Sequence, residues 1–373
     1  TGAQGMTAVL TRDIDMKDIA SWTPIGNGTF AATTAVSTPS GAAFEGTFDG
    51  QGYALRNFKM AATLTGDNQV YGLFGVLKGA TVRNLVLGAE TGDAGSFKVS
   101  GNGVTSAGVI AGASVESTVE DCTSYLPMEC LGNATANKLM TMGLVGFVYG
   151  AGTSEETVTQ LIGLKNYGAL KAVPGAANAN GFTSTQVGCI AGLSNTSRTS
   201  TFRNKITRCV NYGDMEASTG RASGIIAAAN TFTVVSGCDN HGDMLNTYAE
   251  SGGGRLGNIT CILGTASVVD GCTNYGDVVA TNAKTHAGGL VCLLNAADVE
   301  FNNNANYGRV VTDLATYRGT LVANINTFAR MDNNTAGGGV GAYNGGNYQM
   351  ADIDETNYMH YNGLIKPDSE SQV

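Results

Sequence analysis

Asn211-Tyr212-Gly213-Asp214-Met215 is the clearest copy of a short motif that returns along the middle of this chain. The motif joins an asparagine, an aromatic residue and a glycine, usually followed by aspartate and always by an apolar residue in the fifth position. Its copies begin at Asn166, Asn211, Asn240, Asn274 and Asn306, which gives intervals of 45, 29, 34 and 32 residues. A degenerate earlier copy occupies residues 122–125. Self-similarity at such intervals indicates a repeat architecture.

A second repeated unit alternates with the first. It is a glycine followed by three or four apolar residues, as in Gly-Val-Ile-Ala-Gly at 108–112, Gly-Cys-Ile-Ala-Gly at 188–192 and Gly-Ile-Ile-Ala at 224–227. Runs this short, rich in Val, Ile and Thr, are typical of strands, and no apolar period of 3.6 residues lasts long enough for a helix. Short strands at a repeat period stack into a solenoid. With two or three strands per coil, the sequence predicts an all-β parallel β-helix of about eight to ten coils, each roughly 30–45 residues long.

The motif also predicts what happens at the corners of each coil. Asn and Gly tolerate the left-handed backbone conformation that a corner often needs, so we expect the Asn-x-Gly units at corners. Successive coils lie about 4.8 Å apart, so the repeat asparagines should stack in register. Their side-chain amides can then hydrogen-bond along the axis as a ladder.

Composition excludes several classes of protein. The 373 residues include 53 Gly and only 5 Pro, with 43% hydrophobic and 14% charged residues. This much apolar content argues against disorder, and glycine without a three-residue period argues against collagen. The net charge of −9 offers nothing to attract nucleic acid. No apolar run approaches the roughly 18 residues of a transmembrane segment.

Residues 13–87 carry a more specific pattern. Trp-Thr-Pro-Ile-Gly at 22–26, Phe-Glu-Gly-Thr-Phe-Asp-Gly-Gln-Gly at 44–52 and Gly-Leu-Phe-Gly at 72–75 follow one another in it. This order resembles the opening coils of the GLUG-motif β-helix proteins, found on the surfaces of gut and other bacteria. The later Cys-x-Asn-Tyr-Gly-Asp repeats resemble coils that follow in the same proteins, so the resemblance covers about 300 residues. It implies a right-handed parallel β-helix in an exported or outer-surface protein, often assigned to adhesion, with no shared catalytic residues.

We expect one continuous domain. Residues 1–60 should form an N-terminal cap and first coil, residues 61–336 the repetitive coils, and residues 337–373 a C-terminal cap and tail. The Gly-, Asn- and Thr-rich, charge-poor composition and the resemblance predict an extracellular or outer-surface location, with the signal and anchor not present in this sequence.

The eight cysteines are expected to be free and buried. Cys209, Cys238 and Cys272 share one repeat position, where stacking at about 4.8 Å leaves their Cβ atoms farther apart than the roughly 3.8 Å of a disulfide. No Cys-x2-Cys or Cys/His pair has the spacing of a zinc site. The sequence therefore predicts no metal and no cofactor.

One set of aromatic residues is the candidate ligand-binding site. Repetition of the motif should align them in a column: Tyr167, Tyr212, His241, Tyr275 and Tyr307. If the column faces outward, its flat rings could stack on sugar rings; if it crosses a corner, it is only packing.

An acidic column should run beside it. Asp214, Asp243 and Asp277 should stack, with Arg309 in the next copy, and mutual repulsion should keep the carboxylates solvated. A calcium site is the alternative, although the Gly-Gly-x-Gly-x-Asp repeat of calcium-binding β-rolls is absent. Catalysis of glycoside hydrolysis needs paired carboxylates across a cleft, and no such constellation stands out in the repeats.

These observations predict a non-enzymatic cell-surface or secreted β-helix, acting in adhesion or glycan binding through its side face. Its partners would be glycans or host or bacterial surface proteins, with a monomer favoured. The alternatives are a structural stalk or assembly subunit, and a carbohydrate-active enzyme such as a polysaccharide lyase or hydrolase.

Overall fold

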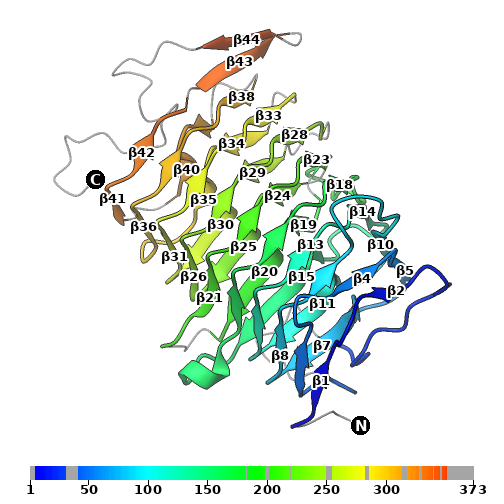
Figure 1. The fold of residues 1–373 in the computed structure, drawn as a ribbon. Coiled ribbons are helices and arrows are strands. Elements are labelled where there is room, and N and C mark those ends of the chain that lie inside the picture. Colours follow the sequence, from blue (N-terminus) through cyan, green and yellow to red (C-terminus); the bar gives the residue numbers. More distant parts are fainter. Residues whose placement is uncertain are drawn as a thin grey trace.

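The chain is a parallel β-helix. The computed structural model describes residues 5–30, 41–181, 183–197, 201–218, 220–248, 254–281, 285–312, 317–326, 330–338, 340–344 and 347–350. Figure 1 shows the strands as parallel rows stacked along one axis, with β1 at one end of the stack and β43 and β44 at the other. Among the described strands every pairing is parallel except that of β43 with β44. The fold predicted from the repeats is confirmed.

Each full coil visits four sheets in turn, which we call the first, second, third and fourth sheets. The first sheet contains β1 (Thr7–Val9), β3 (Thr47–Asp49), β8 (Thr81–Arg83), β12 (Thr118–Glu120), β16 (Gln160–Ile162), β21 (Asn204–Thr207), β26 (Thr233–Ser236), β31 (Val268–Asp270), β36 (Glu300–Asn302) and β41 (Arg330–Asp332). The second sheet contains β2 (Ile14–Asp15), β4 (Ala54–Arg56), β9 (Val86–Leu87), β13 (Thr123–Ser124), β17 (Lys165–Asn166), β22 (Val210–Asn211), β27 (Asp239–Asn240), β32 (Thr273–Asn274), β37 (Ala305–Asn306) and β42 (Thr335–Ala336).

The other two sheets carry the longer strands. The third sheet contains β5 (Lys59–Leu64), β10 (Ser96–Gly101), β14 (Met128–Asn133), β18 (Leu170–Ala172), β23 (Met215–Ala217), β28 (Met244–Asn246), β33 (Val278–Ala280), β38 (Val310–Thr312), β43 (Val340–Asn344) and β44 (Asn347–Met350). The fourth sheet contains β6 (Gln69–Tyr71), β7 (Phe74–Lys78), β11 (Thr105–Val115), β15 (Met140–Gly150), β19 (Thr185–Gly188), β20 (Ala191–Thr196), β24 (Arg221–Ser223), β25 (Ile226–Thr231), β29 (Arg255–Gly257), β30 (Thr260–Thr265), β34 (His286–Gly288), β35 (Val291–Leu294), β39 (Arg318–Gly319) and β40 (Val322–Ile325). One 3-10 turn, η1 (Glu155–Thr157), interrupts the strands, and no helix of the described residues is long and apolar enough to cross a membrane.

The number and length of the coils match the prediction, whereas the number of strands per coil does not. In the first sheet Gln160 pairs with Lys205, 45 residues on, and Lys205 pairs with Val234, 29 residues on. We expected two or three strands per coil, but a full coil has four or five, spread over four sheets. The second-sheet strands are the least visible in the sequence, because nine of the ten span two residues only, too few to produce a recognisable apolar run.

Left-handed residues recur at other corners than the predicted one, because the repeat asparagines end the second-sheet strands and are not left-handed. Between the fourth and first sheets they include Gly79, Glu116, Phe232 and Ala266. Between the first and second sheets, just before the cysteine position of the repeat, a column with φ between 50° and 63° comprises Asn84, Asp121, Gly163, Arg208, Gly237, Gly271, Asn303 and Asn333. These residues share a backbone conformation rather than an identity, so the repeat pattern did not reveal them.

The motif glycines are required by close approach between coils. Gly213, Gly242 and Gly276 are not in the left-handed region. A Cβ atom at Gly242 would overlap the carbonyl oxygen of Gly213, and one at Gly276 would overlap that of Gly242. Each glycine therefore lets its coil settle against the coil before it.

Apolar columns fill the interior. In the first sheet a fully buried set runs from coil to coil in register: Val82, Val119, Leu161, Ile206, Val235, Val269 and Phe301. Burial of side chains of this size stabilises the fold by about 1.5–3 kcal/mol each. Since every interior position touches its equivalents above and below, the core is continuous along the axis.

The N-terminal end is closed by aromatic packing. The indole Nε1 of Trp22 donates to the carbonyl oxygens of Gly72 (3.1 Å) and Leu73 (3.2 Å). Its ring meets Phe58 edge-on at 5.0 Å between centroids. Trp22 and Phe58 belong to the predicted cap of residues 1–60, whereas Gly72 and Leu73 lie beyond it, between β6 and β7.

At the opposite end, the antiparallel pair β43–β44 follows the last parallel pairing of the third sheet (Figure 1). The remainder of the predicted C-terminal segment, residues 351–373, lies outside the described residues.

Two glycine substitutions should separate close approach from backbone conformation. We expect Gly242→Ala to destabilise the protein by about 3 kcal/mol or more, because its methyl group meets the backbone of the neighbouring coil. Gly271 is left-handed with open space around it, so Gly271→Ala should cost only about 1–2 kcal/mol. Thermal unfolding followed by circular dichroism measures both. An equal fall in Tm for the two variants would contradict this account of the motif glycine.

Candidate binding face at a corner of the solenoid

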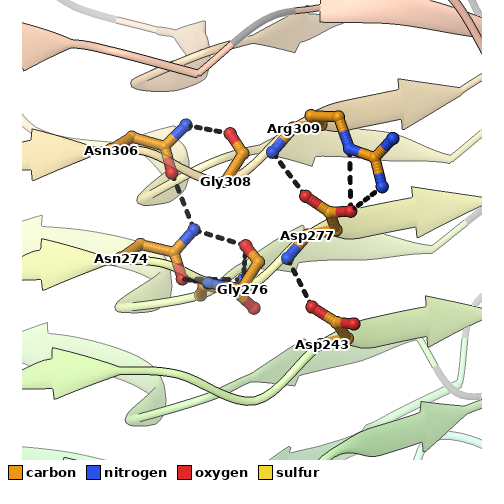
Figure 2. Close-up of polar contacts among 8 residues, drawn as sticks. Asp243, Asn274, Gly276, Asp277, Asn306, Gly308 and Arg309 are labelled. Atoms are coloured by element: carbon orange, nitrogen blue, oxygen red, sulfur yellow. Dashed lines mark hydrogen bonds and ion pairs between the residues drawn. The ribbon is translucent and has the colours of Figure 1, made fainter.

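A buried ladder of asparagine side chains runs beneath the corner between the second and third sheets. Each Nδ2 donates to the Oδ1 of the next repeat asparagine at 2.7–2.8 Å, from Asn166 through to Asn306. Each also donates to the carbonyl oxygen of the motif glycine two residues on, as Asn274 does to Gly276 (Figure 2). The five side chains are 0–1% exposed. The predicted register of Asn211, Asn240 and Asn274 is confirmed by direct strand pairing.

The ladder fixes which side chains point outward. Successive residues of an extended chain point to opposite sides. Asn211 and Gly213 are buried, whereas Tyr212 and Asp214 between and after them are exposed. The same alternation in each coil places the aromatic column and the acidic column next to each other on the outside of the corner.

The five predicted aromatic residues form one continuous column. Neighbouring ring centroids are 4.7 Å apart for Tyr167–Tyr212, 4.9 Å for Tyr212–His241, 4.7 Å for His241–Tyr275 and 5.6 Å for Tyr275–Tyr307, with interplanar angles of 11–21°. The four tyrosines are 40–52% exposed. Tyr125 extends the column by one ring at 4.8 Å. It belongs to the degenerate copy at 122–125, which lacks the motif asparagine and was therefore not included among the candidate site residues.

Stacking determines what the column can offer a ligand. Because the rings lie face to face along the axis, the faces of the interior rings are covered by their neighbours. A sugar ring therefore cannot lie flat on Tyr212 or Tyr275, as the predicted contact requires. What faces solvent is a row of ring edges, one per coil.

The acidic column is bonded along the axis rather than freely solvated. Oδ1 of Asp214 accepts the backbone N–H of Asp243 at 2.9 Å, and Oδ1 of Asp243 accepts that of Asp277 at 2.8 Å. Asp277 accepts the N–H of Arg309 and is paired with its guanidinium group (Figure 2). Asp214 and Asp243 are exposed, as expected, and Asp277 is half-buried; the expectation of repulsion alone did not include the donor that each carboxylate finds in the next coil. Among the described residues no group of three or more His, Cys, Asp or Glu side chains is arranged to hold a metal ion.

A groove of about 610 Å³ adjoins the corner on the third sheet. Phe97, Met128 and Leu170 contribute to its lining, but their side chains belong to the core and are at most 1% exposed. Its outward side chains are charged and come in cross-coil pairs. Lys98 pairs with Glu129 at 2.8 Å, and Lys171 pairs with Glu216 at 3.3 Å. Asp214 of the acidic column also lines the groove, so groove and corner form one surface.

All eight cysteines are free and buried, as predicted. Cys209, Cys238 and Cys272 align in one interior column. Cys122 occupies the same position two coils before Cys209. Burial raises the pKa of Cys122 to about 12. Burial is also the largest cause of the high pKa values of Cys238 and Cys272, and the neighbouring thiols of the column raise these two values further. These thiols are therefore protonated and inert in the folded protein.

Comparison with known proteins adds little to this description. No protein-family model matches the chain, and a search of curated proteins gives no match. Among solved structures, the chain is similar to one described as a "putative immunoglobulin A1 protease from Bacteroides ovatus", with 18% identity over 75% of this chain and 72% of that chain and a TM-score of 0.49. A likeness this distant carries no argument about activity.

Removing one rung of the asparagine ladder should be costly. Asn240→Ala deletes its bonds to Asn211, Asn274 and Gly242 in the core, so we expect a loss of about 2–4 kcal/mol. Asn230 is a matched control, because its side chain bonds that of Asn195 at the exposed surface. Asn230→Ala should change stability by no more than about 0.5 kcal/mol. Chemical unfolding of both variants tests the difference, and similar losses would contradict the role given to the buried ladder.

The thiols should be unreactive until the coils open. We expect no reaction with a thiol reagent at pH 8 in the native state, because attack needs an accessible thiolate. In guanidinium chloride the count should reach the 8 cysteines of the sequence. Rapid native labelling of Cys238, followed by mass spectrometry, would contradict its burial.

Proposed function

We propose that this chain is a non-enzymatic β-helix protein of the cell surface or extracellular space, related to the GLUG-motif proteins, that binds glycans at the corner described above. The observation that carries the proposal is the exposed column of stacked rings. Soluble proteins seldom leave a contiguous set of large apolar side chains in water unless it meets a partner. Here four tyrosines, each 40–52% exposed, lie in one line.

The edges of the column suit a sugar chain that runs along the solenoid. Tyrosine presents an apolar ring and a hydroxyl group that both donates and accepts hydrogen bonds. Asp214 and Asp243 add acceptors on one side of the rings. Repetition at about 4.8 Å offers the same contact several times over, which favours an extended polymer over a single small molecule.

The adjoining groove supports a role in binding rather than in catalysis. Its outward lysine and glutamate side chains can orient a polar ligand by hydrogen bonding. Both of its glutamates are paired with lysines of their own sheet. Paired, outward-facing carboxylates are suited to accepting sugar hydroxyls rather than to moving protons.

A structural stalk is the second candidate, and one observation favours it. The faces of the rings are covered by the neighbouring rings of the column. This stacking stabilises the solenoid by about 0.5–1.5 kcal/mol per pair of rings without any ligand. A stalk of this kind would bind no glycan.

Two pairs of substitutions distinguish these functions. Tyr212→Phe with Tyr275→Phe removes two hydroxyl groups and keeps the stack, so glycan retention should fall about tenfold while Tm stays nearly unchanged. Tyr212→Ala with Tyr275→Ala breaks the stack and should lower both. Tyr53→Phe is the matched control, because Tyr53 is also exposed but lies off the column. The measurement is binding to a dense glycan array, since single-site affinities near the millimolar range, about −4 kcal/mol, need many copies to be detected.

The wild-type protein decides between the candidates directly. Retention on the array that depends on the two hydroxyl groups supports the binding function. Absence of retention on every glycan tested, with Tm lowered only by the alanine pair, would leave the stalk as the function of this column.

A further inference from the structure

A second recess lies away from the aromatic corner, where the chain passes from the third sheet to the fourth. It has a volume of about 330 Å³. Asn178 and Thr183 line one part of it, and Gln186, Arg221 and Arg255 line another. This volume is at the small end of the range for ligand pockets, so it suits one small molecule or one sugar residue.

An insert in one coil forms part of the wall of the recess and is held in place by hydrogen bonds to neighbouring coils. It follows β18 and contributes residues 178, 183 and 184 to the recess. The hydroxyl group of Tyr248, a fully buried side chain, donates to the carbonyl oxygen of Gly181 at 2.7 Å. The Thr183 hydroxyl accepts the N–H of Gly220 at 3.0 Å. These bonds give the wall a defined shape before any ligand arrives.

Polar side chains from successive coils stack at the base of the recess. Gln186 on β19 pairs in register with Arg221 on β24, and Arg221 pairs with Arg255 on β29. Gln186 is 6% exposed, and its Oε1 has no hydrogen-bond donor. An amide oxygen buried without a donor costs about 1–3 kcal/mol.

Arg221 is the second unsatisfied group. Within the part of the chain that the structure describes, its guanidinium group has neither a carboxylate partner nor a hydrogen bond. Burial, together with the charge of Arg255 beside it, lowers the pKa of Arg221. In the next coil, burial and then Arg255 lower the pKa of His286 to about 4, so this histidine is neutral at pH 7. The positive charge of the recess therefore belongs to the arginines.

We propose that this recess binds the carboxylate of an acidic sugar residue. Arg221 is half-buried at the edge of the recess, and a guanidinium without a protein partner pairs strongly, often through two parallel bonds, with a carboxylate. Gln186 lines the same recess and its Oε1 lacks a donor, which a hydroxyl group of a sugar ligand would supply. Together the two unsatisfied groups call for an anion that also carries hydroxyl groups. The inference relies on the proposed glycan binding only for the choice of a sugar as the carrier of the carboxylate.

Three probes separate the two contacts in calorimetric titrations of the whole chain. Galacturonate carries the carboxylate and the hydroxyl groups, galactose carries the hydroxyl groups without the carboxylate, and acetate carries the carboxylate alone. We expect galacturonate to bind at least tenfold more tightly than either of the others. Equal affinity for galactose and galacturonate would overturn the proposal, and equal affinity for acetate would reduce the site to a simple carboxylate site without sugar recognition, which also overturns it.

Substitutions assign the contacts. Arg221→Met should lower galacturonate affinity at least tenfold, whereas Gln186→Met should weaken galacturonate and leave acetate unchanged. Lys165→Met is the charge-matched control, because Lys165 is exposed on the second sheet outside the recess. A similar loss in Lys165→Met, or no loss in Arg221→Met, would overturn the proposal.

Stability provides a readout that a structural arginine would not give. Because Arg221 is half-buried and has no hydrogen bond or ion pair with another described residue, Arg221→Met should leave the ligand-free Tm nearly unchanged. A fall in Tm with galacturonate binding intact would show that Arg221 is a structural residue and would overturn the proposal that it binds the carboxylate. Tyr212→Phe with Tyr275→Phe should leave galacturonate binding intact. Failure of the array experiment and failure of this one are thus separate results.

Discussion

The register between coils is the constraint on which the rest of the structure depends, and the buried asparagine ladder enforces it. The side-chain NH₂ group of each asparagine donates one hydrogen bond to the next asparagine and one to a glycine carbonyl of its own coil. A slip of one residue would flip every side chain to the other side of the strand and leave these amides unpaired in the core. The motif glycines complete the constraint, because only a residue without Cβ lets adjacent coils approach this closely.

Strict register turns each repeat position into a column with a single character. Cysteines become a line of inert thiols in the core, and tyrosines become a stack of rings at the surface. The aspartates show that neighbours along a column can cooperate: like charges repel in water, yet here each carboxylate accepts a backbone N–H from the next coil. The same stacking restricts function, because rings that cover one another leave only their edges to a ligand.

The two candidate sites differ in how completely their polar groups are satisfied. At the aromatic corner the aspartates, lysines and glutamates have hydrogen-bond or ion-pair partners within the protein. A ligand there would add contacts to polar groups that already have partners. In the recess beside the insert, the amide oxygen of Gln186 lacks a donor and Arg221 lacks an acceptor among the described residues. Groups that break the usual rules of satisfaction mark places where a ligand completes the structure. The corner is therefore suited to weak repeated contacts, and the recess to one directed contact.

The sequence by itself determined the parallel β-helix, the range of coil lengths, the register of Asn211, Asn240 and Asn274 and the burial of the cysteines. It could do so because stacking places identical residues at one repeat position on top of one another, so periodicity alone carries the information. Tertiary structure alone decided the second sheet, the left-handed column and the orientation of the rings. It also brought together Gln186, Arg221 and Arg255, which differ in type and follow coils of unequal length. No repeat links them in the sequence, and only the pairing of β19, β24 and β29 makes them neighbours.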